Sequence, residues 1–222
     1  AMADHAMGNR DGWNRSAHPS GGRRASLGIS IPSERQVKRW LGTGWLWRPV
    51  RRVTRWVLFL GMRYYVGMRW EGLEHLPSSG PIIVVANHSS HLDTGALLGL
   101  LGKHYPNVHP VAATDYFFKN RLWSWMSRVF INAVPFDRQA HSTESLGLAI
   151  ALLQQNHALI LYPEGGRSPT GEIQPFKPGV GLLALESGAP VIPVNISGSF
   201  EAMSKGRSIP RRRPVRVRFG AP

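Results

Sequence analysis

The sequence predicts an α/β fold, in which a single mixed, largely parallel sheet is flanked by helices and preceded by an N-terminal amphipathic helical appendage. Three observations lead to this prediction. Short β-branched runs alternate with segments of helical apolar periodicity, which is the pattern of β-α-β units. Gly, Pro or polar residues bound each run. The length of 222 residues suits one domain with a substantial core.

Residues 1–31 are predicted to form a disordered basic N-terminal segment. They are rich in Gly, Ser, Arg, Asn and His and show no apolar periodicity, a composition that cannot bury a core. They also lack the apolar centre of a secretory signal. They are therefore left out of the predicted fold.

Residues 32–67 predict two amphipathic helices. Ser33 is placed to cap the first helix, and Pro49 opens the second. The second combines apolar residues at helical spacing with clustered arginines: Val50, Val53, Val57, Leu60 and Tyr64 beside Arg48, Arg51, Arg52 and Arg55. Its uncharged part, Trp56–Met62, is far shorter than the roughly 20 residues that span a bilayer. The segment fits helices at a membrane interface, and packing of the same stripe on the core is the alternative.

Residues 68–222 are predicted to be the main domain, with alternating strands and helices. The strands are short apolar runs, and the helices carry apolar residues three or four positions apart. The predicted strands cover residues 66–70, 82–86, 108–113, 133–136, 158–162, 191–196 and 215–219. The predicted helices cover residues 94–101, 120–130, 142–155 and 178–188. Because the chain stops at Pro222, directly after a predicted strand, we expect a domain truncated at its C-terminal end.

The net charge of +14 is concentrated at the two ends of the chain. Residues 1–70 hold 13 Lys and Arg against 3 Asp and Glu, residues 71–204 hold 7 against 10, and residues 205–222 hold 7 against none. A nucleic-acid-binding domain is expected to carry its basic residues over the folded domain, whose middle is slightly acidic here. Basic ends beside bulky apolar residues instead favour an anionic membrane surface. The absence of Cys excludes disulfides, thiolate catalysis and Cys-ligated metals.

The most informative stretch is Asn87–Asp93, which follows the predicted strand at residues 82–86. Inside one continuous helix, His88 and Asp93 would point roughly 140° apart, so they can meet only across a strand-to-helix turn. A carboxylate bonded to one imidazole nitrogen fixes the tautomer and leaves the other nitrogen free to take a proton from a hydroxyl. The spacing therefore predicts His88 as a general base that Asp93 orients.

A second candidate site is the loop after the predicted strand at residues 158–162. It reads Glu164-Gly165-Gly166-Arg167, and its glycines let the backbone approach a ligand closely. A guanidinium at such a strand end can hold a phosphate through two hydrogen bonds. A solvated turn with a surface Arg–Glu pair is the alternative.

These residues belong to four blocks, in order, that resemble the motifs of the glycerolipid acyltransferase family. The blocks are the His-x4-Asp pair at residues 88 and 93, Phe136-Asp137-Arg138, Tyr162–Ser168 and Val191-Ile192-Pro193-Val194. This family includes glycerol-3-phosphate and 1-acylglycerol-3-phosphate acyltransferases. The resemblance covers roughly residues 70–219.

The resemblance implies transfer of an acyl group from acyl-CoA or acyl carrier protein to a hydroxyl of a lysophospholipid or glycerol phosphate, with no metal and no cofactor. It assigns Glu164, Gly165 and Arg167 to binding of the acceptor's glycerol phosphate, and Arg138 to a second phosphate contact. Gly166 stands where the family commonly has Thr, so a hydroxyl contact with the acceptor is missing. We expect a membrane-associated protein, peripheral or monotopic, on the cytoplasmic face.

Three other interpretations remain open at this point. The set His88, His91 and Asp93 has the side chains of a metal site, although no His-rich partner motif accompanies it. A hydrolase could use His88 and Asp93 to activate water. A lipid-binding module could carry the same motifs without catalysis.

Overall fold

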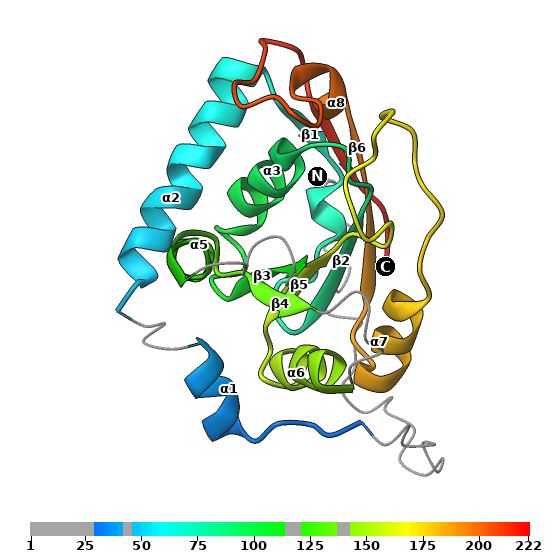
Figure 1. Cartoon of the computed structure of the whole chain (residues 1–222). Helices are drawn as coiled ribbons and strands as arrows, with labels where there is room; N and C mark the ends of the chain where they lie inside the picture. Colours follow the sequence, from blue (N-terminus) through cyan, green and yellow to red (C-terminus); the bar gives the residue numbers. More distant parts are fainter. Residues whose placement is uncertain (1–28, 42–45, 114–120, 137–142) are drawn as a thin grey trace, which may run out of the picture.

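The computed structural model describes residues 29–41, 46–113, 121–136 and 143–222, which form one sheet with helices on both faces (Figure 1). The sheet has seven strands in the order β1-β7-β6-β2-β5-β3-β4. Only the pairing of β6 with β7 is antiparallel. The strands are β1 (Arg69–Glu71), β2 (Ile82–Ala86), β3 (Val108–Ala113), β4 (Val134–Phe136), β5 (Ala158–Leu161), β6 (Val191–Ser197) and β7 (Arg216–Phe219). The predicted mixed, largely parallel sheet is confirmed.

The helices divide between the two faces of this sheet. They are α1 (Glu34–Leu41), α2 (Arg48–Leu60), α3 (His91–Leu101), α5 (Arg121–Met126), α6 (Thr143–Gln154), α7 (Gly179–Ser187) and α8 (Ser199–Ala202), with π-helical turns η2 (Gly61–Val66) and η4 (Ser127–Ile131) and a 3₁₀ turn η3 (Leu73–His75). Helix α3 lies between α2 and the sheet, whereas α6 and α7 cover the opposite face (Figure 1).

The alternation of side chains along β2 explains this layering. Ile82 and Val84 are fully buried in one apolar cluster with Leu97 and Leu101 of α3. Ile83 points the other way, into a second cluster with α6 and α7. A strand that is buried on both faces must be apolar at nearly every position, which is why β2 has the sequence of a continuous apolar run.

Helix α1 packs on the core. For this part of residues 32–67, the structure agrees with core packing, which was the alternative to a membrane interface. Val37 is fully buried in the cluster beneath α6. Ser33 and Gln36 form reciprocal hydrogen bonds at the start of the helix, from Ser33 N to Gln36 Oε1 at 2.7 Å and from Gln36 N to Ser33 Oγ at 3.4 Å. The predicted cap at Ser33 is therefore present.

Helix α2 turns two of its four arginines inward and several of its apolar residues outward. Arg51 and Arg55 are buried and donate to main-chain carbonyl oxygens of Arg128, Val129, Pro106 and Val108. Val53, Trp56 and Val57 are 55–61% exposed. Val53 and Val57 of the predicted apolar stripe therefore do not pack on the core. Leu58 and Phe59 do, and α2 approaches α3 closely at Gly99, where a Cβ would lie 3.0 Å from the Phe59 Cα.

Two helix boundaries differ from the sequence prediction. Helix α3 begins at His91 rather than at residue 94, because Ser90 caps it and Asp93 completes a capping box. The helix predicted over residues 120–130 is α5 continued by the π-helical turn η4, which ends at Asn132 in a left-handed conformation. Within the described ranges, no helix combines the length and apolar character needed to cross a bilayer. The predicted disorder at residues 1–31 falls almost wholly outside the described residues.

Candidate active site

The chain leaves the sheet after β2 through a turn that Asn87 holds. The Asn87 side chain donates to the carbonyl oxygen of Ile196 at 2.8 Å and accepts from the Ile196 N–H at 2.7 Å. This amide takes the place of a peptide group in the pairing with β6, so the backbone of β2 can turn away from the sheet one residue before His88. Sequence reasoning missed this role of Asn87, because its partner lies on a distant strand.

His88 and Asp93 meet across this turn, as predicted. The His88 Nδ1 lies 3.0 Å from the Asp93 Oδ2. The same oxygen accepts the backbone N–H groups of Ser89 and Ser90, each at 2.8 Å, and Asp93 is fully buried. Since the carboxylate only accepts hydrogen bonds, Nδ1 carries the hydrogen and Nε2 keeps a free lone pair.

Glu164 ties the His88 turn to the loop after β5. Its Oε1 accepts the backbone N–H of His88 at 2.6 Å, and its Oε2 accepts the backbone N–H of Gln174 at 2.9 Å. The backbone N–H of Ser168 donates in turn to the His88 carbonyl at 2.7 Å. Both carboxylate oxygens of Glu164 are thus used within the protein, in an arrangement that fixes the two loops against each other.

Gly165 and Lys177 pack together at the edge of the site. Gly165 has a φ of +72°, and a Cβ there would lie 2.8 Å from the Lys177 Cε and 2.9 Å from its Nζ. Glycine at position 165 therefore gives both the left-handed turn and the space that the lysine occupies. Lys177 also lines the same pocket as His88.

Arg167 lies close enough to His91 for its charge to act on that imidazole. Burial lowers the pKa of His91 to about 4, and the positive charge of Arg167 acts in the same direction. His91 is therefore neutral near pH 7. Arg138, the second predicted phosphate contact, lies outside the described residues.

Two residues next to His88 had no predicted role. The Tyr162 ring stacks on the His88 imidazole, with centroids 3.9 Å apart and planes 15° apart. Its hydroxyl shares a hydrogen bond of 2.9 Å with the Thr94 hydroxyl. The signal available in the sequence was the position of Tyr162, directly after a strand that pairs with β2 through Val85 and Leu161.

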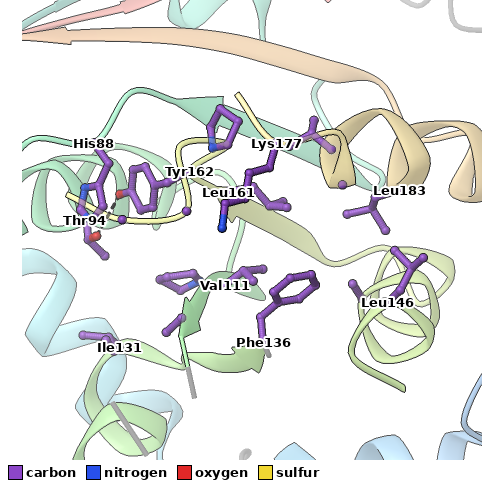
Figure 2. Close-up of a pocket in the computed structure, with 18 of the residues that line it drawn as sticks. His88, Thr94, Val111, Ile131, Phe136, Leu146, Leu161, Tyr162, Lys177 and Leu183 are labelled. Atoms are coloured by element: carbon purple, nitrogen blue, oxygen red, sulfur yellow. Dashed lines mark hydrogen bonds between the residues drawn. The ribbon is translucent and has the colours of Figure 1, made fainter. Parts of the chain in front are cut away.

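A pocket of about 150 Å³ opens beside these side chains. Figure 2 shows His88, Thr94 and Tyr162 at one end and Leu146 and Leu183 at the other. The rest of the lining is mostly apolar and includes Pro110, Val111, Ala112, Ile131, Phe136, Ala149, Leu161 and Val180. The pocket thus joins a polar end that carries a base to an apolar end. Among the described residues, no group of three or more His, Asp or Glu side chains is arranged to hold a metal ion.

Comparison with known proteins places this architecture in a family. Residues 67–197 match the family model described as Acyltransferase. The chain is 32% identical over 139 residues to the chloroplastic 1-acyl-sn-glycerol-3-phosphate acyltransferase BAT2 of Brassica napus, over 61% of this chain and 39% of that protein. It is 32% identical over 168 residues to 1-acyl-sn-glycerol-3-phosphate acyltransferase alpha of Mus musculus, over 72% of this chain and 58% of that protein.

The fold is also similar to that of a solved structure. The crystal structure of the 1-acyl-sn-glycerophosphate (LPA) acyltransferase PlsC from Thermotoga maritima matches with a TM-score of 0.63 and 26% identity, over 86% of this chain and 73% of that one. The two curated relatives are longer proteins, of which this chain spans 39% and 58%. Because the family model matches more than half of the sequence, the chain belongs to the acyltransferase family, as its four motifs predicted.

Proposed function

We propose that the protein transfers a fatty acyl group from a thioester, acyl-CoA or acyl carrier protein, to a hydroxyl of a lysophospholipid or glycerol phosphate, with 1-acylglycerol-3-phosphate as the preferred acceptor. The observation that carries the proposal is the His88–Asp93 pair at the polar end of an apolar pocket. The names of the similar proteins support the choice of acceptor.

His88 is proposed as the general base. Its Nε2 takes the proton from the acceptor hydroxyl as the hydroxyl oxygen attacks the thioester carbonyl. The tetrahedral intermediate then collapses, the carbon–sulfur bond breaks, and the imidazolium returns its proton to the departing thiolate. The products are an ester and a free thiol. Asp93 would hold the ring in the tautomer that this sequence needs, since its Oδ2 accepts the Nδ1 hydrogen.

The phosphate of the acceptor is proposed to bind at the loop after β5. Arg167 would supply the guanidinium, and Lys177 a second positive charge, because it lines the pocket and packs on Gly165. Arg138 is retained in this proposal from the motif alone. Glu164 would act by holding the loop in place, since its carboxylate bonds to two backbone N–H groups.

An acyl chain is proposed to occupy the apolar end of the pocket. The wall there consists of side chains from α6, α7 and the ends of β3, β4 and β5. Such a surface stabilises an alkyl chain by removing it from water.

Membrane association is proposed to occur through the outer face of α2. Val53, Trp56 and Val57 are exposed there, beside the exposed Arg52. The basic residues of the C-terminal loop, Arg211–Arg213, are exposed as well. An apolar face beside arginines fits the headgroup region of an anionic bilayer. Cytoplasmic leaflets contain anionic lipids, so this is the membrane face that the proposal favours. The protein would then be peripheral or monotopic.

The decisive test of the reaction is His88→Ala, assayed by mass spectrometry of the lipid products from mixed donors and acceptors. Loss of the base should lower kcat by about 10²- to 10⁴-fold. His104→Ala is a matched control, because His104 is exposed in the turn after α3. Activity of H88A within a few-fold of the parent contradicts the assignment. Thiol release that does not depend on lysolipid identifies a hydrolase instead, and lipid binding without turnover identifies a binding module.

The membrane proposal has a separate test. Trp56→Ser removes a ring that is 61% exposed, so it should weaken flotation with anionic vesicles and leave the fold intact. Leu185→Ser is the control, because Leu185 is 79% exposed on α7, away from α2. Equal flotation of the two variants contradicts a membrane contact at α2.

A further inference from the structure

Tyr162 presents the face of its ring to the proposed base. The ring centroids of Tyr162 and His88 are 3.9 Å apart, and the planes lie 15° from parallel. The edge of the imidazole that carries Nδ1 is bonded to Asp93 at 3.0 Å, so the aromatic ring and the carboxylate contact different parts of His88. The imidazole is therefore held both in its plane and from one face.

The position of the Tyr162 ring is fixed at both ends. Its backbone follows β5, whose last residue, Leu161, pairs with Val85 of β2. Its hydroxyl is bonded to Thr94, the residue after Asp93 in the first turn of α3. The ring thus bridges the strand beside the site and the helix that carries the carboxylate, and it cannot move away without breaking one of these connections.

Tyr162 is suited to act through its ring and not through its hydroxyl. Burial raises the pKa of the phenol well above its usual value, and the negative charge of Asp93 raises it further. The phenol therefore stays protonated over the whole range in which an enzyme of this kind works. A neutral phenol ring has a negative face, which attracts a cation placed over it.

We propose that Tyr162 is a positioning residue that stabilises the protonated form of His88 during acyl transfer. When Nε2 takes the proton of the acceptor hydroxyl, the imidazole becomes a cation stacked on the electron-rich face of the Tyr162 ring. The neutral imidazole of the resting state gains much less from this contact. The interaction is therefore stronger in the transition state than before it, which is the condition for raising kcat. The inference rests on the proposed function of His88.

The other charged groups near His88 must be kept constant in any test. Asp93 and His91 face it from α3, and Glu164 faces its backbone from the loop after β5. Arg167 acts on the neighbouring His91, and Lys177 lines the same pocket as His88. Substitution of Tyr162 alters none of these charges, so a change in the titration of His88 can be attributed to the ring.

The first experiment compares Tyr162→Leu with Tyr162→Phe. The Leu variant loses the aromatic face and should lose about 5- to 30-fold in kcat/KM, the range that corresponds to a cation–π contact. Without the ring, the cationic imidazole is less favoured, so the acidic limb of the pH profile of kcat/KM should move to lower pH by about one unit. The Phe variant keeps the ring and should recover to within about threefold of the parent. A merely structural role would lower the plateau without moving the limb.

A second series covers the case in which the Leu variant fails to fold. Phe, 4-fluoro-, 3,5-difluoro- and 3,4,5-trifluorophenylalanine are incorporated at position 162, where each fluorine weakens the negative face of a ring of nearly constant shape. We expect kcat/KM to fall stepwise and the acidic limb to move to lower pH stepwise. The titration of the His88 ring, followed by NMR, should move in the same direction and does not require turnover.

The outcomes separate the two proposals. A flat fluorine series, or a Phe variant as impaired as the Leu variant, overturns the role of the Tyr162 ring while the acyltransfer assignment stands. A parent protein without acyl transfer overturns the proposed function, and the NMR titration then still decides whether the ring stabilises the His88 cation. A stepwise series in both measurements supports the inference.

Discussion

Asp93→Asn tests the orientation of the proposed base with little change in shape. The carboxylate accepts three N–H groups at one oxygen, from His88, Ser89 and Ser90. An amide oxygen in the same place can still accept the two backbone donors, so the start of α3 should remain capped. What the substitution removes is the negative charge beside the imidazole.

The size of the effect follows from the geometry. A full positive charge develops on His88 as it takes the proton, with its Nδ1 3.0 Å from the Asp93 oxygen and the centres of charge about 4 Å apart. At an effective dielectric constant of about 20, this pair is worth about 4 kcal/mol, or roughly 10³-fold in rate. The loss cannot exceed that of His88→Ala, because both substitutions act on the same group.

The stability of the variant should fall only moderately. The new amide nitrogen would take the place of Asp93 Oδ1, which is buried and has no hydrogen-bond partner among the described residues. An unsatisfied amide there costs about 1–3 kcal/mol. Asp93→Ala should cost more, about 3 kcal/mol or above, because it leaves His88 Nδ1 and two backbone N–H groups without their acceptor.

The test is steady-state kinetics of Asp93→Asn, His88→Ala and the double variant H88A/D93N. Urea unfolding checks that each variant is folded. We expect the double variant to be no slower than H88A, since residues that act as one unit are not additive. A folded D93N protein with kcat within tenfold of the parent would refute the role of the carboxylate. So would a double variant far slower than H88A.

Three further predictions concern the loop, the pocket and the core. Glu164→Gln replaces one of the two carboxylate acceptors by an NH₂ group that faces a backbone N–H. The free energy of unfolding in urea should fall by about 1–3 kcal/mol, and kcat/KM should fall as well. Unchanged values of both would contradict the contact between the two loops. Leu183→Trp should shift the products toward shorter acyl chains in mass spectrometry, because Leu183 lines the apolar end of the pocket, whereas Leu185→Trp on the exposed face of the same helix should not. Burial lowers the pKa of His109 to about 3, so below about pH 6.5 the unfolded chain takes up a proton on this residue and the folded chain does not. The free energy of unfolding should therefore fall by about 2 kcal/mol from pH 7 to pH 5 because of His109. Urea unfolding of the His109→Gln variant at the two pH values should lack this decrease.

The central part of the fold could be predicted because its signals are local. β2 and β5 are short apolar runs between polar turns, and both are buried as such runs require. The His88–Asp93 turn was predictable for the same reason, since only four residues separate the two. The order of the strands was not, because the antiparallel return of β7 onto β6 depends on pairing between distant segments.

The orientation of α2 shows what a helical pattern leaves undecided. The apolar stripe with Val53 and Val57 is as compatible with burial as with exposure. The outcome depends on Arg51 and Arg55, whose acceptors are carbonyl groups 51–78 residues further along the chain. Inward-facing arginines that donate to main-chain carbonyls have no local sequence signature, so the exposure of Val53 and Val57 could not be derived from periodicity alone.

The site shows the same limit. The motif at residues 162–168 covers the loop that is bonded to the His88 turn, but the partners of Glu164 are backbone N–H groups of residues 88 and 174. A sequence motif gives the residue type and not what the side chain touches. The stacking of Tyr162 on His88 likewise arises from the parallel pairing of β2 with β5, which places the residues after the two strands side by side.

The inward arginines of α2 also determine how the proposed enzyme would sit on a lipid surface. Arg51 is bonded to carbonyl groups of η4, and Arg55 to those of Pro106 and Val108, so the helix is attached to two separate parts of the domain. A helix attached at two places cannot rotate or move independently of the domain. If Trp56 enters the headgroups, the depth of its insertion would therefore set the height of His88, the proposed base, above the bilayer, and substrates would have to reach that height to react.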